Sequence, residues 1–203
     1  CIRDRSKPEE KITIIDTVEY EGLKKGQSYK LLGTLMDKET GKPIEVDGNP
    51  VTAETTFKPK KTSGSTEVKF TFDATSLRGK TIVVFEELYQ DDLKLAVHAD
   101  IEDEDQTIYF PEIKTTAKDA HTDSNLSLAG KEVTLVDTVT YTHLLPGKTY
   151  VMKGVLMTSA GNALMVNGKT ITASTEFVPT TPDGTVDVTF NFDASEIGGR
   201  KLV

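Results

Sequence analysis

The stretch TIIDTVEYEGLKKGQSYKLLGTLMDKETG, residues 13–41, decides the fold because the chain contains it twice. Its counterpart is TLVDTVTYTHLLPGKTYVMKGVLMTSAG, residues 134–161. Two further pairs follow in the same order: VTAETTF (51–57) with ITASTEF (171–177), and EVKFTFDATSLRGKTIV (67–83) with DVTFNFDASEIGGRKLV (187–203). The copies are about 120 residues apart, so the sequence predicts two tandem copies of one structural unit.

Each copy consists of short alternating runs rich in Val, Thr, Phe and Tyr. Turn residues such as Lys25-Gly26, Asp47-Gly48 and Gly198-Gly199 separate these runs. Short strands at this spacing are typical of an antiparallel β-sandwich. No amphipathic helix is evident, and only Thr75–Leu77 and Ser195–Ile197 are expected to form single turns between strands.

The register of the repeat predicts that each copy lacks one end. Copy 2 begins with PEIKTTAKDAHTDSNLSLAG (111–130), whereas copy 1 has only CIRDRSKPEE (1–10) there, so its first strand is expected upstream of residue 1. Copy 1 continues through FEELYQDDLKLAVHADIEDEDQTIYF (85–110), and copy 2 stops at Val203 where that continuation should begin. We therefore predict domain 1 at 1–110, without its first strand, and domain 2 at 111–203, without its C-terminal strands.

Composition excludes several classes of protein. Apolar residues make up 36% and charged residues 28% of the chain, enough to bury a core in each copy. The net charge of −8 and the lack of a basic patch argue against nucleic acid or an anionic membrane as partner. The one cysteine, Cys1, permits no disulfide within the chain. Without an initiator Met, a signal peptide or an apolar run of membrane-spanning length, the chain is expected to be a piece of a longer protein.

No motif of a conventional enzyme is present. The chain has no Gly-rich phosphate loop, no G-x-S-x-G, no H-E-x-x-H and no paired cysteines, so no cofactor is expected. The acidic run DIEDED (100–105) lacks the spacing and the glycine of an EF-hand loop. We interpret it as a solvated turn and predict no metal site.

Four polar residues fall on apolar faces when strand alternation is applied. Asp16 shares a face with Ile14 and Val18, and Asp137 occupies the same position in copy 2. Glu86 shares a face with Val84 and Leu88, and Gln106 stands where the acidic turn meets an apolar strand. Buried carboxylates are costly unless they are neutral or paired. The plainer alternatives are an Asp that accepts from a turn amide and a Glu that faces solvent at a strand end.

Together these residues resemble the VaFE repeat, also called the T–Q ester-bond domain. The resemblance rests on LVDTVTY…LLPGKTY…GVLM, on FTFDAT…GKTIVVFEELY and on HADIEDEDQTIYFPEI, and it covers nearly the whole chain. It implies two tandem Ig-like antiparallel β-sandwich domains. It also implies a covalent ester between a Thr of the first strand and a Gln of the last strand, formed when the Thr hydroxyl attacks the Gln carbonyl and ammonia leaves.

The resemblance assigns roles residue by residue. Gln106 matches the acceptor of copy 1, and Thr115 or Thr116 the donor of copy 2, with Thr115 preferred because it shares a face with Ile113 and Ala117. The matching catalytic residues are Asp16, Glu86, His98 and Asp137. For His98 the plainer alternative is a half-exposed surface histidine. Gln106 and Thr115 are expected to belong to different domains and not to react with each other.

The chemistry explains why these residue types are needed. A hydroxyl is a weak nucleophile and an amide a poor electrophile, so both need assistance. Neutral buried acids can donate hydrogen bonds to a developing oxyanion, and a histidine can transfer the proton to the departing nitrogen. Such a reaction runs once within the chain, so the protein is not expected to be an enzyme.

The resemblance implies a stalk module of a Gram-positive, cell-wall-anchored surface adhesin. Its expected partners are the neighbouring repeats of the same chain, with any host ligand bound by other domains. Two alternatives remain open: an adhesin module that binds a glycan or host matrix, and an isopeptide-type pilin domain with Lys–Asn bonds. The low aromatic content of 7%, without Trp, disfavours the first, and Gln in place of Asn in QTIYF (106–110) disfavours the second.

Overall fold

The computed structural model describes residues 11–202, so Cys1, the rest of the segment 1–10 and Val203 lie outside the described residues. Strands make up 55% of the structure and helices 3%. Every strand pair of the described residues is antiparallel. The predicted all-β class with tandem β-sandwiches is therefore confirmed. Among the described residues, no helix is long and apolar enough to cross a membrane.

The chain divides into two compact units, Cys1–Pro111 and Glu112–Val203. Unit 1 has nine strands and two one-turn 3₁₀ helices among its described residues: β1 (Ile12–Tyr20), β2 (Tyr29–Asp37), β3 (Glu45–Val46), β4 (Asn49–Pro50), β5 (Thr52–Phe57), β6 (Gly64–Phe72), η1 (Thr75–Leu77), β7 (Thr81–Gln90), β8 (Leu93–His98), η2 (Glu104–Gln106) and β9 (Thr107–Tyr109). Helix η1 is the single turn predicted for Thr75–Leu77.

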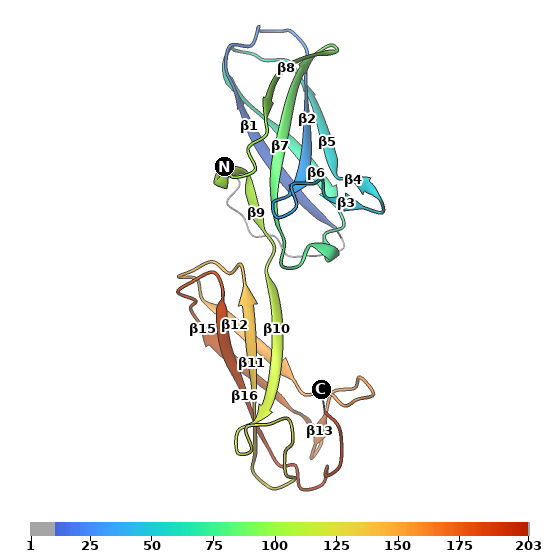
Figure 1. Ribbon diagram of the computed structural model, residues 1–203, viewed down its shortest axis with the longest axis vertical. Helices are drawn as coiled ribbons and strands as arrows, with labels where there is room; N and C mark the ends of the chain where they lie inside the picture. Colours follow the sequence, from blue (N-terminus) through green and yellow to red (C-terminus); the bar gives the residue numbers. More distant parts are fainter. Residues whose placement is uncertain (1–10, 203) are drawn as a thin grey trace. The chain divides into compact units, whose positions relative to one another are not determined.

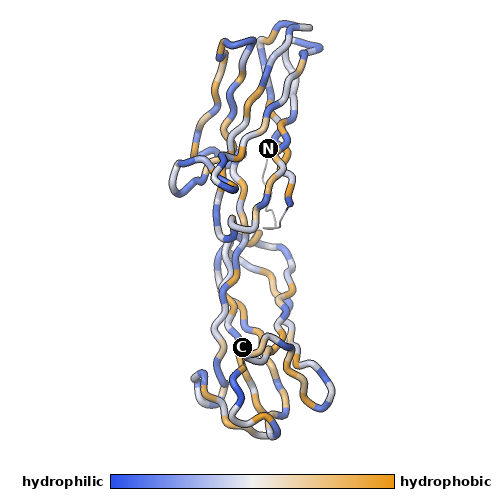
Figure 2. Tube along the Cα trace, turned by 90° about the vertical axis from the view of Figure 1, so that its right-hand side faces the viewer, coloured by the Kyte–Doolittle hydropathy of each residue, from blue (hydrophilic) through white to orange (hydrophobic). Residues whose placement is uncertain are grey.

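Two sheets form the sandwich of unit 1 (Figure 1). One pairs β1 with β6, and the other has the order β5-β2-β7-β8, with β9 also paired to β7. Strands β3 and β4 form a separate small hairpin. Alternate residues of both sheets point into one core, and Figure 2 shows the resulting alternation of hydrophobic and hydrophilic positions along the strands. Val68 and Phe70 of β6 meet Leu31 and Leu35 of β2 and Ile82 of β7 there.

Unit 2 repeats the first part of this arrangement. Its strands are β10 (Glu112–Asp119), β11 (Val133–Thr142), β12 (Tyr150–Val155), β13 (Met165–Val166), β14 (Lys169–Thr170), β15 (Thr172–Phe177) and β16 (Gly184–Phe192). The sheets are β10-β11-β16, β12-β15 and the hairpin β13-β14. Asp137 lies opposite Val188, as Asp16 lies opposite Val68 in unit 1, so the two units share one strand register.

One difference between the units bears on the site. In unit 2, β11 is paired on one side with β16 and on the other with β10. In unit 1, the corresponding strand β1 pairs only with β6 among the described residues. Strand β10 therefore shows what a first strand looks like in this fold and which edge it occupies.

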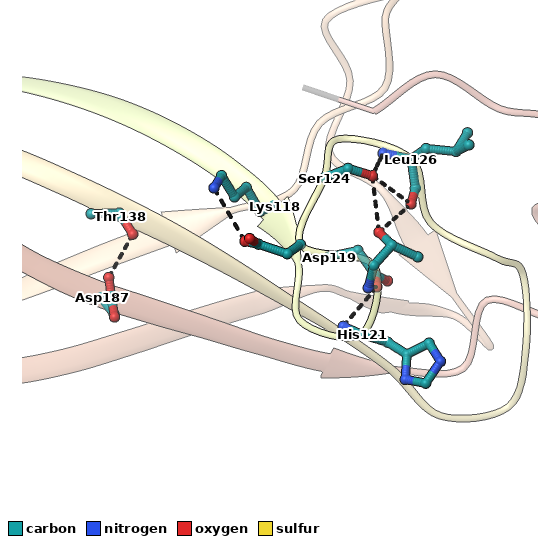
Figure 3. Close-up of polar contacts among 9 residues, drawn as sticks. Lys118, Asp119, His121, Ser124, Leu126, Thr138 and Asp187 are labelled. Carbon is teal, nitrogen blue, oxygen red and sulfur yellow. Dashed lines mark hydrogen bonds and ion pairs between the residues drawn. The ribbon is translucent and has the colours of Figure 1, made fainter.

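The loop that follows β10 is organised by a buried carboxylate, as Figure 3 shows. Asp119 accepts hydrogen bonds from the backbone amides of His121 and Thr122 at 2.9 and 2.8 Å and from the Ser127 hydroxyl at 2.5 Å. These hydrogen bonds lower the pKa of Asp119, and the bond from the Ser127 hydroxyl has the largest effect, with that from the Thr122 backbone amide next. This loop connects β10 to β11 and fixes the end of β10.

Asp119→Ala should increase amide hydrogen exchange in residues 120–127, because two backbone amides and one hydroxyl lose their acceptor. Since its pKa is lowered, the wild-type carboxylate should keep these contacts as the pH falls below the ordinary range of an Asp. Exchange protection measured by NMR would test this. Asp123→Asn, which removes the charge of the exposed pair with Lys118 and tolerates the positive φ of this position, is the matched control and should leave the protection unchanged.

Candidate functional site

Two buried carboxyl groups face each other across the core of unit 1. Asp16 on β1 is 1% exposed and Glu86 on β7 is 3% exposed, as strand alternation predicts for both. By strict donor–acceptor geometry neither carboxyl has a hydrogen-bond partner among the described residues, but the two carboxyls lie close enough for the contact between them to raise the pKa of Glu86. The alternative in which a turn amide satisfies Asp16 is thus wrong, and so is the alternative in which Glu86 faces solvent.

The environment of Glu86 favours its neutral form. Burial makes the largest contribution to the raised pKa of the Glu86 carboxyl, the adjacent Asp16 carboxyl makes the next, and the charge of Asp103 makes a smaller one. Together they raise the pKa of Glu86 to about 10. Glu86 is therefore protonated at neutral pH. A protonated carboxyl in a poorly hydrated site is a hydrogen-bond donor that can stabilise a developing oxyanion.

His98 is placed beside Glu86 by strand pairing. The register of β7 and β8 sets Glu86 directly opposite His98, and directly opposed side chains in an antiparallel pair lie on the same face. A β-bulge after Leu88 shifts the register further along the hairpin but leaves this pair aligned. The His98 side chain is 49% exposed, which agrees with the half-exposed histidine of the plainer alternative. It also lies opposite one of the two buried carboxyl groups, Glu86.

Gln106 ends the 3₁₀ helix η2 rather than lying on the strand that the sequence suggested. Its Oε1 atom is nevertheless buried and has no hydrogen-bond partner, so the amide points inward as expected. The next residue, Thr107, is fully buried and begins β9, which pairs with β7. Backbone pairing therefore anchors Gln106 to the strand that carries Glu86.

Asp103 links the histidine to the turn that carries Gln106, and sequence reasoning missed it. Its Oδ2 lies 2.9 Å from His98 Nε2, and its Oδ1 accepts from the Asp105 amide at 2.8 Å as the N-cap of η2. The composition of the run DIEDED indicates only a solvated turn. The D-x-x-Q spacing of Asp103 and Gln106, which resembles a helix-capping pattern, is the signal that could have identified it.

A groove borders the site between β1 and β8. It has a volume of about 220 Å³ and is lined by Val18, Tyr20, Glu86, Leu88, Ala96 and His98, among others. Val18 and Tyr20 correspond to Val139 and Tyr141 of unit 2, which pair with Thr115 and Ile113 of β10. The groove of unit 1 therefore lies along the part of β1 that corresponds to the part of β11 paired with the Thr-bearing strand β10 in unit 2.

Among residues 11–110, the buried side-chain polar atoms that lack a hydrogen-bond partner all lie in this site. Within residues 11–110, each buried side-chain oxygen or nitrogen without a hydrogen-bond partner belongs to Asp16, Glu86 or Gln106. Buried polar groups of folded proteins are nearly always hydrogen-bonded, and clustered exceptions mark strained or functional sites. No group of three or more His, Cys, Asp or Glu residues in the described part of the chain is placed to hold a metal ion.

Unit 2 brings together the remaining candidates. Burial raises the pKa of Asp137, and the Thr115 hydroxyl beside it offsets part of that rise. Asp137 Oδ1 is buried without a partner. Thr116 lies on the opposite face, where its cross-strand neighbour Thr138 donates to Asp187 at 2.7 Å (Figure 3). Thr115 therefore shares a face with the acid, and Thr116 does not.

The site residues are distributed over both units. Asp16, Glu86, His98 and Gln106 lie in unit 1, whereas Thr115 and the second acid, Asp137, lie in unit 2. Unit 1 thus holds an acceptor amide with its acids and histidine. Unit 2 holds a hydroxyl beside an acid.

Comparison with known proteins gives two findings. Residues 3–110 and 111–203 each match the family described as the T-Q ester bond containing domain. Among solved structures, the chain is similar to a bacterial adhesin from Mobiluncus mulieris containing intramolecular disulfide, isopeptide and ester bond cross-links, with 15% sequence identity, a TM-score of 0.44 and coverage of 96% of this chain and 89% of that chain. The search of curated proteins returned no match.

Proposed function

Because this chain belongs to the family of T-Q ester bond containing domains, with one domain in each half, we propose that it is a structural module of a bacterial surface adhesin. In this proposal each complete domain is stabilised by an ester that it forms autocatalytically between a threonine and a glutamine. The module reacts once with itself and turns over no external substrate.

One observation carries the proposal. The buried oxygens without partners in the described part of unit 1 belong to the two acids and the acceptor amide, Asp16, Glu86 and Gln106. A buried polar group left without a hydrogen bond costs about 1–3 kcal/mol, so a cluster of such groups in one place calls for a functional reason. An incoming hydroxyl and the oxyanion that it creates would supply the missing partners.

The reaction assigns a task to each residue. The donor Thr Oγ attacks Cδ of Gln106, and the protonated Glu86 donates a hydrogen bond to the oxygen that becomes negative. Asp16 keeps Glu86 protonated, and His98 transfers the hydroxyl proton to the amide nitrogen, which leaves as ammonia. One C–O bond forms and one C–N bond breaks, so the net change is the loss of NH₃.

The donor of unit 1 is proposed to be a threonine on a strand that pairs with β1, as β10 pairs with β11. In unit 2, Thr115 lies opposite Val139, which corresponds to Val18. A Thr opposite Val18 would enter the groove lined by Glu86 and His98. We assign Thr115, rather than Thr116, as the donor of unit 2 because only Thr115 neighbours an acid, Asp137.

Gln106 and Thr115 are not proposed to react with each other, because they belong to different units. Each is expected to react with a residue of its own complete domain. When the chain is under tension, a covalent bond between the first and last strands carries the load in place of the hydrogen bonds between strands. This suits a stalk on the cell wall of a Gram-positive bacterium, where the partners of this segment are its neighbouring repeats.

A change in mass tests the proposal. If residues 111–131 are joined ahead of residue 11, the transplanted threonine should lie opposite Val18 and complete unit 1. Because one ammonia leaves, the intact mass should fall by about 17 Da, and peptide mapping should find the transplanted Thr115 linked to Gln106. The 203-residue chain serves as the reference.

Two variants of this extended chain act as controls. Replacing the transplanted Thr115 by Val removes the nucleophile, and Gln106→Leu removes the leaving group, so neither should lose mass. Replacing the transplanted Thr116 by Val should leave the reaction intact, because that residue lies on the other face. An unchanged mass in an extended chain that is folded by NMR would contradict the proposed ester.

A further inference from the structure

Two loops meet at the end of unit 1 where β1 and β5 end and β2 and β6 begin. The Leu23 amide of one loop donates to the Thr62 carbonyl of the other at 3.0 Å. The Gly26 amide donates to the Pro59 carbonyl at 2.9 Å. Between these two hydrogen bonds each loop carries only lysines: Lys24, Lys25, Lys60 and Lys61. The loops are far apart in sequence, so the fold assembles a basic patch, and the expectation that the chain has none is wrong.

These four lysines and Lys58 form a lysine patch that is exposed and unneutralised. All five are exposed, and none of them makes an ion pair with a residue in the described range 11–202. The loop backbone is held in place, because the Tyr29 hydroxyl accepts from the Lys24 amide at 3.0 Å and Leu23 and Pro59 are buried. Like charges on facing segments repel each other, so an anionic partner would stabilise this end of the unit.

Unit 2 shows that the loops do not need these charges. Its corresponding loops are joined by the same two hydrogen bonds, from Leu144 to Pro182 at 2.8 Å and from Gly147 to Pro179 at 2.9 Å. The contact of a loop amide with a tyrosine hydroxyl also recurs, at Tyr150. All five lysine positions are uncharged there: Leu145, Pro146, Val178, Thr180 and Thr181. The lysine patch is therefore specific to unit 1 and is not required by the loop structure.

The other residues of the two loops indicate which anion fits the patch. Apart from the lysines and Glu21, the exposed residues of 21–28 and 58–63 are uncharged and polar or small: Gly22, Gly26, Gln27, Ser28, Thr62 and Ser63. Within these two loops no exposed aromatic side chain can stack on a base, and no exposed apolar side chain can enter a membrane. Lysines act as point charges, and amide and hydroxyl groups can hydrogen-bond to sugar hydroxyls. The loops therefore fit a sulfated polysaccharide better than a nucleic acid or a lipid surface.

We propose that the lysine patch of unit 1 binds sulfated polysaccharides. The four facing lysines contact sulfate groups, Lys58 extends the contact, and the neighbouring hydroxyl and amide groups bind the sugar. The choice of an extracellular polysaccharide rests on the proposed function, which places the module on a cell surface. Binding is reversible and needs no ester, so it can be measured on the 203-residue chain.

The first test measures binding of a labelled heparin oligosaccharide to this chain by fluorescence anisotropy. Counterion release governs such contacts, so four of them predict that raising the salt from about 50 to about 200 mM weakens binding roughly 50- to 150-fold. Neutralising the facing lysines should weaken binding by about tenfold or more at the lower salt. That variant combines Lys24→Gln, Lys25→Gln, Lys60→Gln and Lys61→Gln.

The matched control removes the same charge from four exposed lysines scattered over unit 2. It combines Lys114→Gln, Lys118→Gln, Lys153→Gln and Lys169→Gln, and its affinity for heparin should stay close to that of the wild type. Unchanged binding after neutralisation of the facing lysines, or an equal loss in the control, would overturn the inference.

A transplant tests whether the paired loops are sufficient. Because the loops of unit 2 have the same hydrogen bonds, lysines introduced there should restore binding to the chain whose facing lysines are neutralised. This variant adds Leu145→Lys, Pro146→Lys, Thr180→Lys and Thr181→Lys.

The identity of the anion is tested with three other probes. Desulfated heparin, a DNA duplex and phosphatidylserine vesicles should each bind more weakly than heparin, and binding of any of them at least as tight would overturn the choice of a sulfated polysaccharide. The proposed function fails separately. A chain that binds heparin but forms no ester when extended would refute only the ester, whereas one that forms the ester without binding heparin would refute only this inference.

Discussion

Glu86→Gln should stabilise unit 1 at neutral and alkaline pH and remove much of its pH dependence. The folded pKa of Glu86 is raised from 4.5 to about 10, chiefly by burial and then by Asp16. Between these values the unfolded chain loses the proton and the folded chain keeps it, so the wild type loses stability as the pH rises. The free energy of unfolding can fall by about 1.4 kcal/mol per pH unit. The wild type can therefore lose up to about 4 kcal/mol of stability between pH 5 and pH 8.

The variant isolates this single titration. Gln has nearly the shape of a protonated Glu and carries no charge at any of these pH values, so Glu86→Gln should gain about 2–4 kcal/mol over the wild type at pH 8 and little at pH 5. Urea unfolding followed by hydrogen exchange of peptides from β1 and β7 reports on unit 1 alone. Equal gains at both pH values would show that Glu86 does not fold in its neutral form.

The adjacent residue supplies a control of opposite sign. Glu87 points to the other face of β7, where the hydrogen bond from Lys94 and then that from Tyr89 lower its pKa. Glu87→Gln should therefore give no gain at pH 8, since it removes a carboxylate that is already paired in the folded state. A gain like that of Glu86→Gln would point to general relief of the net charge of −8.

The features that could be predicted most accurately from the sequence are those that depend on side-chain alternation along a strand. The period of two in a strand places Asp16 and Glu86 on inner faces, and both are almost fully buried. The repeat then transfers the register from one unit to the other, so that Asp137 lies opposite Val188 as Asp16 lies opposite Val68. Strand alternation also distinguishes Thr115 from Thr116 as the candidate donor, because adjacent residues of a strand lie on opposite faces of the sheet.

Contacts between distant segments were beyond such rules. Gln106 ends a 3₁₀ helix because Asp103 caps it, and that capping competes with extension of β9 by one residue. The pairing of Glu86 with His98 depends on the register of β7 and β8 and on the position of a bulge, neither of which alternation specifies. The groove between β1 and β8 follows from packing of two sheets and has no local sequence signal.

Gly33→Ala should destabilise unit 1 by about 1–3 kcal/mol, although alanine normally stabilises a strand relative to glycine. A Cβ added at Gly33 would lie 2.5 Å from Cζ of the Phe70 ring, which is 1% exposed at the centre of the core. The ring can retreat only by displacing Leu31, Leu35 or other packed neighbours. The backbone of Gly33 lies outside the left-handed region, so the cost arises from packing alone.

A double-mutant cycle can separate this contact from other effects. Phe70→Ala should cost about 3–5 kcal/mol through the cavity that it leaves, and in that background Gly33→Ala should become neutral or favourable because Cβ now has room. Gly154 and Phe190 repeat the contact in unit 2, again at 2.5 Å, so the same cycle there should destabilise only unit 2. If Gly33→Ala costs as much without the ring as with it, the close approach of glycine and phenylalanine is not what requires glycine at this position of both repeats.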